Sequence, residues 1–306
     1  MKLLHAATEL AAGDRPVCLA IGVFDGVHLG HQQIIRQTIA DARAHDAVAL
    51  VVTFDCHPNS VVAPDRVPPL IYSQPQKLRA IEALGANALL ELRFDKHFSE
   101  HSGETFARDL ARDLGKVRSI CVGAEFVFGH RRSGDVALLK KLGAELDFFV
   151  HGLAAVSLDG QVVSSTRIRE TIRAGDLHAA SQMLGRPYAI GGQVVAGDKI
   201  GRQMGFPTAN LDAAHLVLPP DGVYAGRTKI NGRPHRVALN VGVRPTVGRP
   251  PQLRVEAHVL DFAGELYGTN MEVQVGKKLR AEMKFTSAAA LSEQIGRDVA
   301  RVRAEG

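Results

Sequence analysis

Apolar runs and amphipathic stretches alternate over the first half of the chain. Strand-like apolar runs fall at residues 17–24, 47–54, 86–94, 117–123 and 147–153. Helical patterns with one apolar face fall between them at 31–44, 73–84, 103–114 and 134–146. This alternation is typical of βα units whose strands form a parallel sheet. We therefore expect a parallel α/β domain in this part of the chain.

The pattern changes after about residue 184, where short β-like segments follow one another without helices between them. Asn231-Gly232 lies between two such segments and predicts a two-residue hairpin turn. Residues 253–262 alternate, with Val255, Ala257 and Val259 on one face and Glu256, His258 and Leu260 on the other. An apolar stripe predicts a last helix at 287–305. We expect a small β-barrel or sandwich closed by this helix, and two domains, 1–183 and 184–306.

The composition is that of a globular protein, with 45% hydrophobic and 23% charged residues among 306. The net charge of +5 suits nucleic acid and anionic small molecules equally well. Aromatic residues make up only 5% and Trp is absent, which does not favour a base-stacking surface. No apolar run has membrane-spanning length, and the N-terminus is too polar for a signal peptide. We expect a cytoplasmic protein with no nucleic-acid or membrane partner, acting on small molecules as a monomer or weak homo-oligomer.

The three cysteines, Cys18, Cys56 and Cys121, are far apart and form no CxxC pair. A disulfide framework or a zinc knuckle is not expected from this spacing, and reduced, buried thiols are the ordinary alternative.

The segment GVFDGVHLGHQ, residues 22–32, follows the first strand-like run. In open α/β sheets this carboxyl edge is where ligands bind, and the free N–H groups of a following helix favour anions. We expect that helix to begin at or near His31, with Gly30 allowing close approach of a phosphate. The imidazoles of His28 and His31 can donate hydrogen bonds to phosphate oxygens, without a covalent nucleophile. The alternative is a surface turn that happens to carry two histidines.

The segment SSTRIR, residues 164–169, also stands where a strand-like run meets a helix. Ser165 or Thr166 can cap this helix while its N–H groups and Arg169 hold a phosphate. The alternative is a plain cap followed by solvated arginines. Together the two segments resemble the nucleotidyltransferases, in which both motifs clamp the phosphates of a nucleoside triphosphate. The resemblance implies a Rossmann-like fold and an ATP site at Gly22, Phe24, Asp25, Gly30, Ser165, Thr166 and Arg169.

Two more segments, TFDCHPNS (53–60) and VGAEFVFGHRRSGD (122–135), narrow the resemblance. They are similar to loops of the FAD synthetase module of bifunctional riboflavin kinase/FAD synthetases. The resemblance implies flavin-side or nucleotide roles for His57, Pro58, Glu125 and Phe128, although an ordinary loop histidine is the alternative for His57. Cys56 stands where the family commonly has proline, which puts the shape of this loop in question. Glu125 stands where the family commonly has Asp or Asn and keeps the carboxylate.

The segment GDKIGRQMGFPTANL, residues 197–211, is the most specific in the chain. Its glycines permit close approach to phosphates, but Lys199 precedes most of them and no P-loop is present. Thr208 and Asn210 supply hard oxygens next to Pro207, of the kind that Mg²⁺ prefers. A glycine- and proline-rich turn capped by Asn is the alternative.

This segment resembles the flavokinase signature, and PPDGVYAG, LNVGVRPT, VEAHVLDF and KKLR follow in family order. The resemblance implies a flavokinase-type β-barrel with a C-terminal helix. It implies a MgATP site at Gly197, Lys199, Gly205, Pro207, Thr208 and Asn210, with Thr208 and Asn210 holding Mg²⁺. It also implies that Glu256 is the catalytic base that takes the proton from the ribityl hydroxyl of riboflavin. A solvent-facing strand carboxylate is the alternative for Glu256.

The whole chain is thus expected to be a bifunctional enzyme that uses ATP and Mg²⁺. Its barrel would phosphorylate riboflavin to FMN, and its α/β domain would adenylylate FMN to FAD with release of pyrophosphate, so FAD is a product. One rival is a nucleotidyltransferase for a pantetheine or nicotinamide phosphate, with the barrel as a binding module. Another is an RNA-binding or regulatory protein that uses the basic surface.

Overall fold

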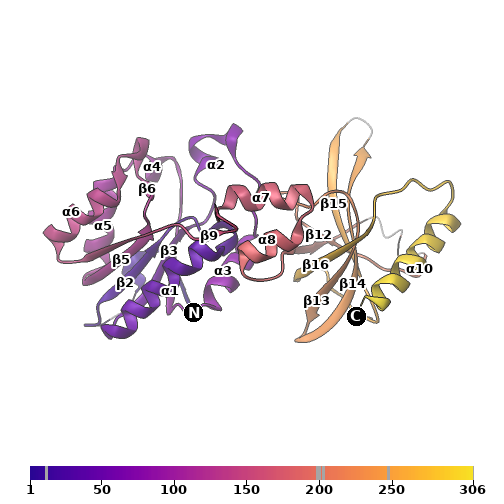
Figure 1. Cartoon of the computed structure of the whole chain (residues 1–306), viewed down its shortest axis with the longest axis horizontal. Helices are drawn as coiled ribbons and strands as arrows, with labels where there is room; N and C mark the ends of the chain where they lie inside the picture. The colour runs from indigo at the N-terminus through magenta and orange to yellow at the C-terminus, as the bar shows by residue number, and fades with distance from the viewer. Residues whose placement is uncertain (11–12, 198–200, 202–203, 247–248, 306) are drawn as a thin grey trace. The chain divides into compact units, whose positions relative to one another are not determined.

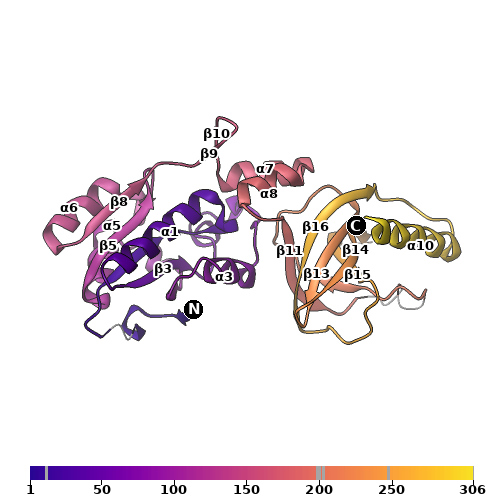
Figure 2. The same ribbon diagram turned by 60° about the horizontal axis from the view of Figure 1, so that its bottom comes forward.

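The computed structural model describes residues 1–10, 13–197, 201, 204–246 and 249–305 (Figures 1 and 2). The chain divides into two compact units. The first contains Met1–Pro68 and Lys77–Ser164, and the second contains Pro69–Gln76 and Ser165–Gly306. Among the described residues, no helix combines the length and the apolar character that a membrane span requires.

The first unit is built on a six-stranded sheet with the strand order β1-β4-β3-β2-β5-β8. All neighbouring pairs are parallel. The strands are β1 (Lys2–Leu4), β2 (Val17–Ile21), β3 (Val48–Phe54), β4 (Ala88–Leu92), β5 (Val117–Gly123) and β8 (Phe149–Leu153). The predicted strands are therefore confirmed, and β1 is an additional edge strand. Its three residues are too few to show a period in the sequence.

Helices cover both faces of this sheet, as the continuous apolar strands require. α1 (Leu29–Ala44) and α3 (Gln74–Glu82) contribute Ile35 and Ile81 to one apolar layer, and α5 (Gly103–Leu114) and α6 (Val136–Leu146) contribute Leu110 and Leu142 to the other. Shorter elements of this unit are α2 (Asn59–Val62), α4 (Lys96–Ser99), β6 (Val127–Phe128), β7 (Gly134–Asp135), β9 (Ser157–Leu158) and β10 (Gln161–Val162).

The second unit contains a closed barrel with the strand order β11-β12-β15-β14-β13-β16. Its strands are β11 (Ala189–Val195), β12 (Ala209–Leu211), β13 (Gly222–Ile230), β14 (Arg233–Thr246), β15 (Arg249–Val259) and β16 (Asn270–Arg280), paired antiparallel. Asn231 and Gly232 have φ of 50° and 78° at the β13–β14 turn, which confirms the predicted hairpin. Of the two predicted alternatives, the structure shows a barrel and not a sandwich.

Among its described residues this unit also contains the helices α7 (Ser165–Ala174), α8 (Leu177–Leu184) and α10 (Ala288–Ala304). α10 lies along the outside of the barrel in both views (Figures 1 and 2). Its Val299 and Val302 pack with Leu260 in a small apolar cluster. Arg280 of β16 forms an ion pair of 2.8 Å with Asp298 of α10, and both side chains are largely buried. This pair holds the last helix against the barrel.

The segment Pro69–Gln76 belongs to the second unit although it comes from the first half of the chain. Leu70 forms a β-bridge with Leu216, and Gln76 donates to the carbonyl of Ala189 at 3.1 Å. Arg186 donates to the Tyr72 hydroxyl at 3.0 Å. The barrel therefore depends on a segment that the sequence does not mark as part of it. The domain boundary at residues 183/184 stays a prediction.

Candidate active sites

A strained turn joins β2 to α1 at the carboxyl edge of the parallel sheet. Phe24, Gly26 and Val27 have φ of 53°, 76° and 41°. A β-branched residue such as Val27 rarely adopts a positive φ, and strain of this kind is concentrated at functional sites. The turn brings the end of β2 directly onto the first turn of α1.

Two glycines of this turn make room for aromatic rings. A Cβ on Gly22 would lie 3.0 Å from the Phe24 ring, and a Cβ on Gly30 would lie 3.2 Å from Cε1 of His28. The glycines thus permit the positions of Phe24 and His28. The absence of a Cβ at Gly30 makes room for the ring of His28 and also leaves the backbone N–H groups accessible.

His28 and His31 lie together at the start of α1. Their rings are stacked with centroids 3.6 Å apart. The ring of His31 also meets the ring of Phe24 edge to face, with centroids 5.3 Å apart. The helix begins at Leu29, two residues before His31, and the side chain of His28 is its N-cap. Its Nδ1 accepts the backbone N–H of His31 at 3.4 Å. In the neutral ring of His28 the proton is therefore on Nε2, where it can be donated to a ligand.

Aromatic side chains that the sequence analysis did not single out gather after neighbouring strands of the same sheet edge. Phe54 ends β3, Phe94 follows β4, and Phe98 lies in α4. Their rings meet in edge-to-face pairs with centroids 5.2–5.9 Å apart, and Phe98 continues the contact to Phe106. The sequence did contain a signal for this cluster, because a phenylalanine stands at or just after the ends of two successive predicted strands. Each residue on its own resembled ordinary core.

The loop after β5 packs closely against the start of α5, and glycines make this close approach possible. A Cβ on Gly129 would lie 2.2 Å from the nitrogen of Gly103, and a Cβ on Gly134 would lie 2.7 Å from the Phe128 ring. Phe128 is partly buried and stacks on Phe126 at 5.2 Å. The predicted residue Glu125 is exposed at the tip of this loop. The loop therefore presents an aromatic pair and a carboxylate.

The loop after β3 holds the other predicted flavin-side residues. Nδ1 of His57 accepts the backbone N–H of Asn59 at 3.1 Å, and Pro58 precedes α2. Cys56, at the position where proline is common, donates its thiol to the carbonyl of Phe94 at 3.5 Å. Burial raises the pKa of this thiol, so it stays protonated. The cysteine thus fixes the loop by a hydrogen bond.

Lys77 of α3 lies beneath this loop and was also missed by the sequence analysis. Its ammonium group donates to the Phe54 carbonyl at 2.9 Å and to the Thr53 hydroxyl at 3.3 Å. The side chain is buried, and burial lowers its pKa to about 8 against the opposing effects of Glu91 and Asp25. The lysine fixes the end of β3.

Residues 165–169 of the SSTRIR segment lie on α7, in the second unit. The helix begins at Ser165, so Ser165 and Thr166 lie in its first turn rather than ahead of it as caps. Arg169 is buried, and its Nε donates to the carbonyl of Pro69 at 2.8 Å. Arg169 is therefore not one of the solvated arginines of the alternative. The structure does not bring these three residues into one unit with His28 and His31.

A cavity of about 430 Å³ lies in the second unit and is lined by three of the predicted kinase residues, Thr208, Asn210 and Glu256. This volume is in the range of small-molecule sites. Its lining residues come from the segment 201–210, from β13, β14 and β15, and from the chain from Arg280 into α10. They include Thr208, Asn210, Asn240, Arg254, Glu256, Arg280, Glu282 and Asp298. Asn240 and Arg254 were not predicted as site residues.

Glu256 stands at the centre of a row of polar side chains across three strands. It faces Asn210 on β12 and Asn240 on β14 in the strand register. Arg254, two residues earlier, lies 3.5 Å from Oε1 of Glu256, whose side chain is 29% exposed. The neighbours Val255 and Ala257 fill the barrel interior. Glu256 therefore lies on the outer face of the barrel wall, where it lines the cavity together with residues of α10.

The glycines of the segment 197–211 have distinct roles. A Cβ on Gly197 would lie 2.2 Å from Nδ2 of Asn210, so only glycine leaves Asn210 its place. Gly205 has φ of 82°, which favours glycine. Pro207 is exposed and its carbonyl lies 2.8 Å from Nδ1 of His258. Lys199 lies outside the described residues.

Comparison with known proteins shows the family to which the chain belongs. The chain matches the FAD synthetase family over residues 11–167 and the riboflavin kinase family over residues 184–305. The bifunctional riboflavin kinase/FMN adenylyltransferase of Escherichia coli (strain K12) is 36% identical over 300 residues, covering 97% of this chain and 96% of that protein. The chain belongs to the bifunctional riboflavin kinase/FMN adenylyltransferase family. It therefore combines an FAD synthetase segment with a riboflavin kinase segment, as its motifs predicted.

Other members of this family are similarly related. The protein of the same name from Bacillus subtilis (strain 168) is 35% identical over 92% of this chain and 89% of its own length. A crystal structure described as a macrolide-efflux protein from Streptococcus pneumoniae matches with a TM-score of 0.80 at 27% identity, covering 98% of both chains. This likeness supports the fold. The riboflavin kinase match over the barrel argues against the rival in which the barrel is only a binding module.

Proposed function

We propose that the two reactions of this family occur at the two sites described above, with ATP as co-substrate of each. The cavity beneath α10 is the riboflavin kinase site, and the carboxyl edge of the parallel sheet is the FMN adenylyltransferase site. The observation that carries the first assignment is the row Asn210–Glu256–Asn240 in a cavity of small-molecule size. The stacked pair His28–His31 at the start of α1 carries the second.

In the kinase site, Glu256 is the general base. Its carboxylate accepts the proton of the riboflavin hydroxyl while that oxygen attacks the γ-phosphorus of ATP. The bond that breaks is the one between the γ-phosphorus and the oxygen that bridges to the β-phosphate, so ADP leaves. Arg254 holds one oxygen of Glu256 at 3.5 Å, which leaves the second oxygen for the substrate hydroxyl.

The oxygen donors of this cavity fit a magnesium ion. Thr208 and Asn210 lie two residues apart at β12, so their side chains share a face, and the carboxylate of Glu282 lines the same cavity. Hydroxyl, amide and carboxylate oxygens are the ligands that Mg²⁺ prefers. When bound, the ion would neutralise charge on the β- and γ-phosphates. Thr208 and Asn210 would hold it.

In the adenylyltransferase site, the chain supplies positioning and hydrogen-bond donors. An oxygen of the FMN phosphate attacks the α-phosphorus of ATP, and pyrophosphate leaves with the bonding electrons. His28 donates from Nε2 to an α-phosphate oxygen as negative charge builds up there, and His31 supports it by stacking. Asp25 lies buried in the strained turn beside them, and Gly22 leaves room for Phe24. For Ser165, Thr166 and Arg169 of α7, what supports a role in binding the phosphates of ATP is the resemblance of their segment to the nucleotidyltransferase motif.

The flavin ring of FMN is proposed to bind on the aromatic side chains of the same sheet edge. Phe54, Phe94 and Phe98 are partly exposed there, and Phe128 is held by Gly134 on the neighbouring loop. A flat heteroaromatic ring stacks well on such side chains. His57, Pro58 and Glu125 lie on the loops that carry this surface and complete the flavin-side or nucleotide contacts.

We also propose that the protein acts in the cytoplasm, as a monomer or weak homo-oligomer, without a nucleic-acid partner. Two observations support the absence of a nucleic-acid partner. Aromatic residues make up only 5% of the chain, and this family has anionic substrates, so the positive net charge needs no nucleic acid to explain it. Salt-dependent RNA binding at physiological ionic strength would contradict it.

The proposed function is tested by supplying the flavins separately. The full chain with riboflavin, ATP and Mg²⁺ should produce FMN first and FAD later, as separated by chromatography. With FMN supplied it should produce FAD and pyrophosphate directly. Formation of FMN from riboflavin without any FAD would contradict the assignment of the α/β unit. Formation of FAD from supplied FMN, without any FMN from riboflavin, would contradict the assignment of the barrel.

A further inference from the structure

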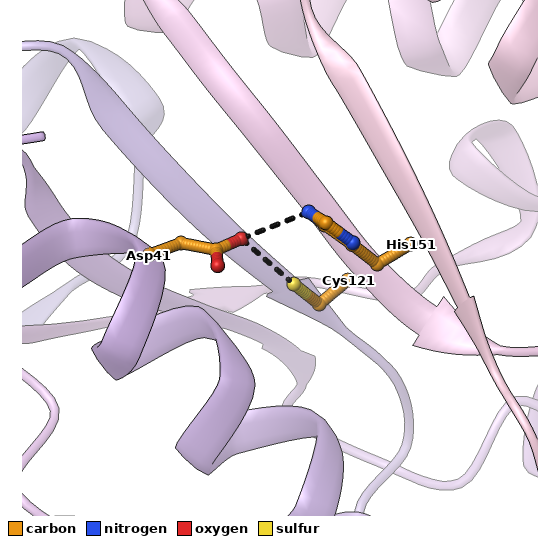
Figure 3. A group of neighbouring side chains, drawn as sticks. All are labelled: Asp41, Cys121 and His151. Atoms are coloured by element: carbon orange, nitrogen blue, oxygen red, sulfur yellow. Dashed lines mark hydrogen bonds and ion pairs between the residues drawn. The ribbon is translucent and has the colours of Figure 1, made fainter. Parts of the chain in front are cut away.

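A side-chain cluster on the first unit belongs to neither proposed site. Asp41 near the end of α1, Cys121 on β5 and His151 on the edge strand β8 converge between the helix and the sheet (Figure 3). Oδ2 of Asp41 lies 3.1 Å from Nε2 of His151 and 3.6 Å from Sγ of Cys121. Asp41 is 13 residues after His28 on the same helix, which is about 20 Å along its axis. The cluster is therefore separate from the phosphate site.

The donor atoms are spaced as ligands of one metal ion are. All three lie within 4.8 Å of one another. In a tetrahedral zinc site, metal–ligand bonds of about 2.0–2.3 Å place neighbouring ligand atoms roughly 3.3–3.7 Å apart. The two distances from Asp41 are close to these values. Thiolate, imidazole and carboxylate are also the three ligand types that zinc uses in proteins.

The cluster does not have the arrangement of a catalytic cysteine. In such a relay the histidine lies between the thiol and the carboxylate, whereas here Asp41 lies between Cys121 and His151. Cys121 is fully buried, and burial raises the pKa of its thiol to about 12. An inaccessible, protonated thiol is a poor nucleophile.

Neighbouring side chains hold the carboxylate in place. Gln37 donates to Oδ1 of Asp41 at 2.7 Å, and Ser119 donates to Oδ2 at 2.9 Å. Such partners orient a metal ligand. The side chain of Asp41 is only 12% exposed, whereas His151 is 40% exposed. The histidine therefore forms the solvent side of the cluster, where an ion can enter and a water molecule can complete its coordination.

We propose that Asp41, Cys121 and His151 bind one zinc ion, or a divalent ion of similar softness, with water as the fourth ligand. The thiol proton of Cys121 is released to solvent as the metal–sulfur bond forms, and His151 binds as the neutral imidazole. The thiolate selects against Mg²⁺, which prefers oxygen ligands. Because the ligands come from α1, β5 and β8, the ion joins the edge strand to the centre of the unit. The cysteine spacing alone gave no sign of this, since two of the ligands are not cysteines.

The test uses Co²⁺ as a spectroscopic probe of the full chain after removal of metals with a chelator. One equivalent of Co²⁺ should produce a thiolate-to-cobalt charge-transfer band, unaffected by a large excess of Mg²⁺. Cys121→Ser should lose the band, and His151→Ala should weaken Co²⁺ binding at least tenfold. Cys56→Ser, which changes a cysteine outside the cluster, should keep the wild-type spectrum.

A second measurement distinguishes loss of metal binding from misfolding of a variant. Zn²⁺ should raise the melting temperature of the wild-type chain and of Cys56→Ser, but not that of Cys121→Ser. Circular dichroism of the metal-free variants should match the wild type. The proposal is overturned if the wild-type chain gives no charge-transfer band with Co²⁺, or if Cys121→Ser keeps the band.

Discussion

Asn210 and Glu256 face each other directly across the neighbouring strands β12 and β15. Directly opposed side chains of an antiparallel pair lie on one face, with Cβ atoms about 4.5–5.5 Å apart. Asn210 belongs to the proposed nucleotide segment, and Glu256 is the proposed base for riboflavin. The two halves of the kinase reaction therefore meet at this pair, and the strand register alone brings them together.

The first prediction concerns the base. Glu256→Gln keeps the size of the side chain but cannot accept the hydroxyl proton. Riboflavin phosphorylation should fall by about 10²–10⁴-fold, as is usual on loss of a general base. Conversion of supplied FMN to FAD should be unchanged, because it uses the other unit. Both are measured by chromatography of the flavins.

Its matched control is Glu293→Gln on α10, which removes an exposed carboxylate outside the cavity lining. This variant should retain both activities. Wild-type kinase turnover in Glu256→Gln would rule out the general-base role and leave the carboxylate as a strand residue of the cavity wall.

The second prediction concerns the space that Asn210 occupies. In Gly197→Ala the new Cβ would lie 2.2 Å from Nδ2 of Asn210, so the amide must move. Riboflavin kinase activity should fall at least tenfold with a raised KM for ATP, while FAD synthesis from FMN continues. Gly296→Ala on α10 is the control, since its Cβ would meet only Phe206 at 4.0 Å. Equal kinase activity in Gly197→Ala and Gly296→Ala would contradict the role of Asn210.

The sequence was sufficient where a period or a motif carries the information. The strands at 48–54 and 117–123 and the hairpin at Asn231-Gly232 were predicted from such signals, and the two family segments were predicted from their motifs. The sequence did not show which face of β15 lines the cavity. Alternation of apolar and polar residues defines two faces of a strand, but it does not show which face a helix covers. Pro69–Gln76 was missed for a related reason. Its bonds to Ala189 and Arg186 join residues more than 100 positions apart.

The third prediction separates two functions of His28. His28→Asn retains a side chain that can cap α1 but lacks Nε2–H, whereas His28→Ala loses both. Both variants should lose FAD formation by on the order of a hundredfold, as is common for a lost donor to a developing charge. Only His28→Ala should also lower the melting temperature. Riboflavin kinase activity should continue in both.

His45→Ala, at the opposite end of the same helix, is the control and should keep full FAD synthesis. The double variant His28→Ala/His31→Ala should abolish FAD formation entirely. Unchanged FAD output from that double variant would remove both histidines from the mechanism.

The fourth prediction is a pH dependence that comes from Lys77. Its pKa is lowered to about 8 by burial, while that of the unfolded chain stays near 10.5. Between these values the unfolded state binds more protons, so the free energy of unfolding rises with pH in that window. Relative to Lys77→Met, wild-type stability should rise by on the order of 2–3 kcal/mol between pH 8 and 10.5. Lys140→Met, which removes an exposed lysine, should show no such difference from wild type in urea unfolding.

The last prediction is that the two activities can be separated at about residue 184. The riboflavin kinase match begins at residue 184, and the barrel begins with β11 at Ala189. A fragment of residues 184–306 should convert riboflavin to FMN, and residues 1–186 should convert FMN to FAD.

The structure adds a condition to this separation. The fragment 184–306 lacks Pro69–Gln76, so Leu216 loses its β-bridge and the carbonyl of Ala189 loses the amide of Gln76. Each lost hydrogen bond at a buried group costs about 1–3 kcal/mol, so this fragment should be active but melt below the barrel of the full chain. Adding a synthetic peptide of residues 69–76 should raise its melting temperature. A fragment that unfolds cooperatively and binds MgATP, yet never phosphorylates riboflavin, would contradict the assignment of the kinase to the barrel alone.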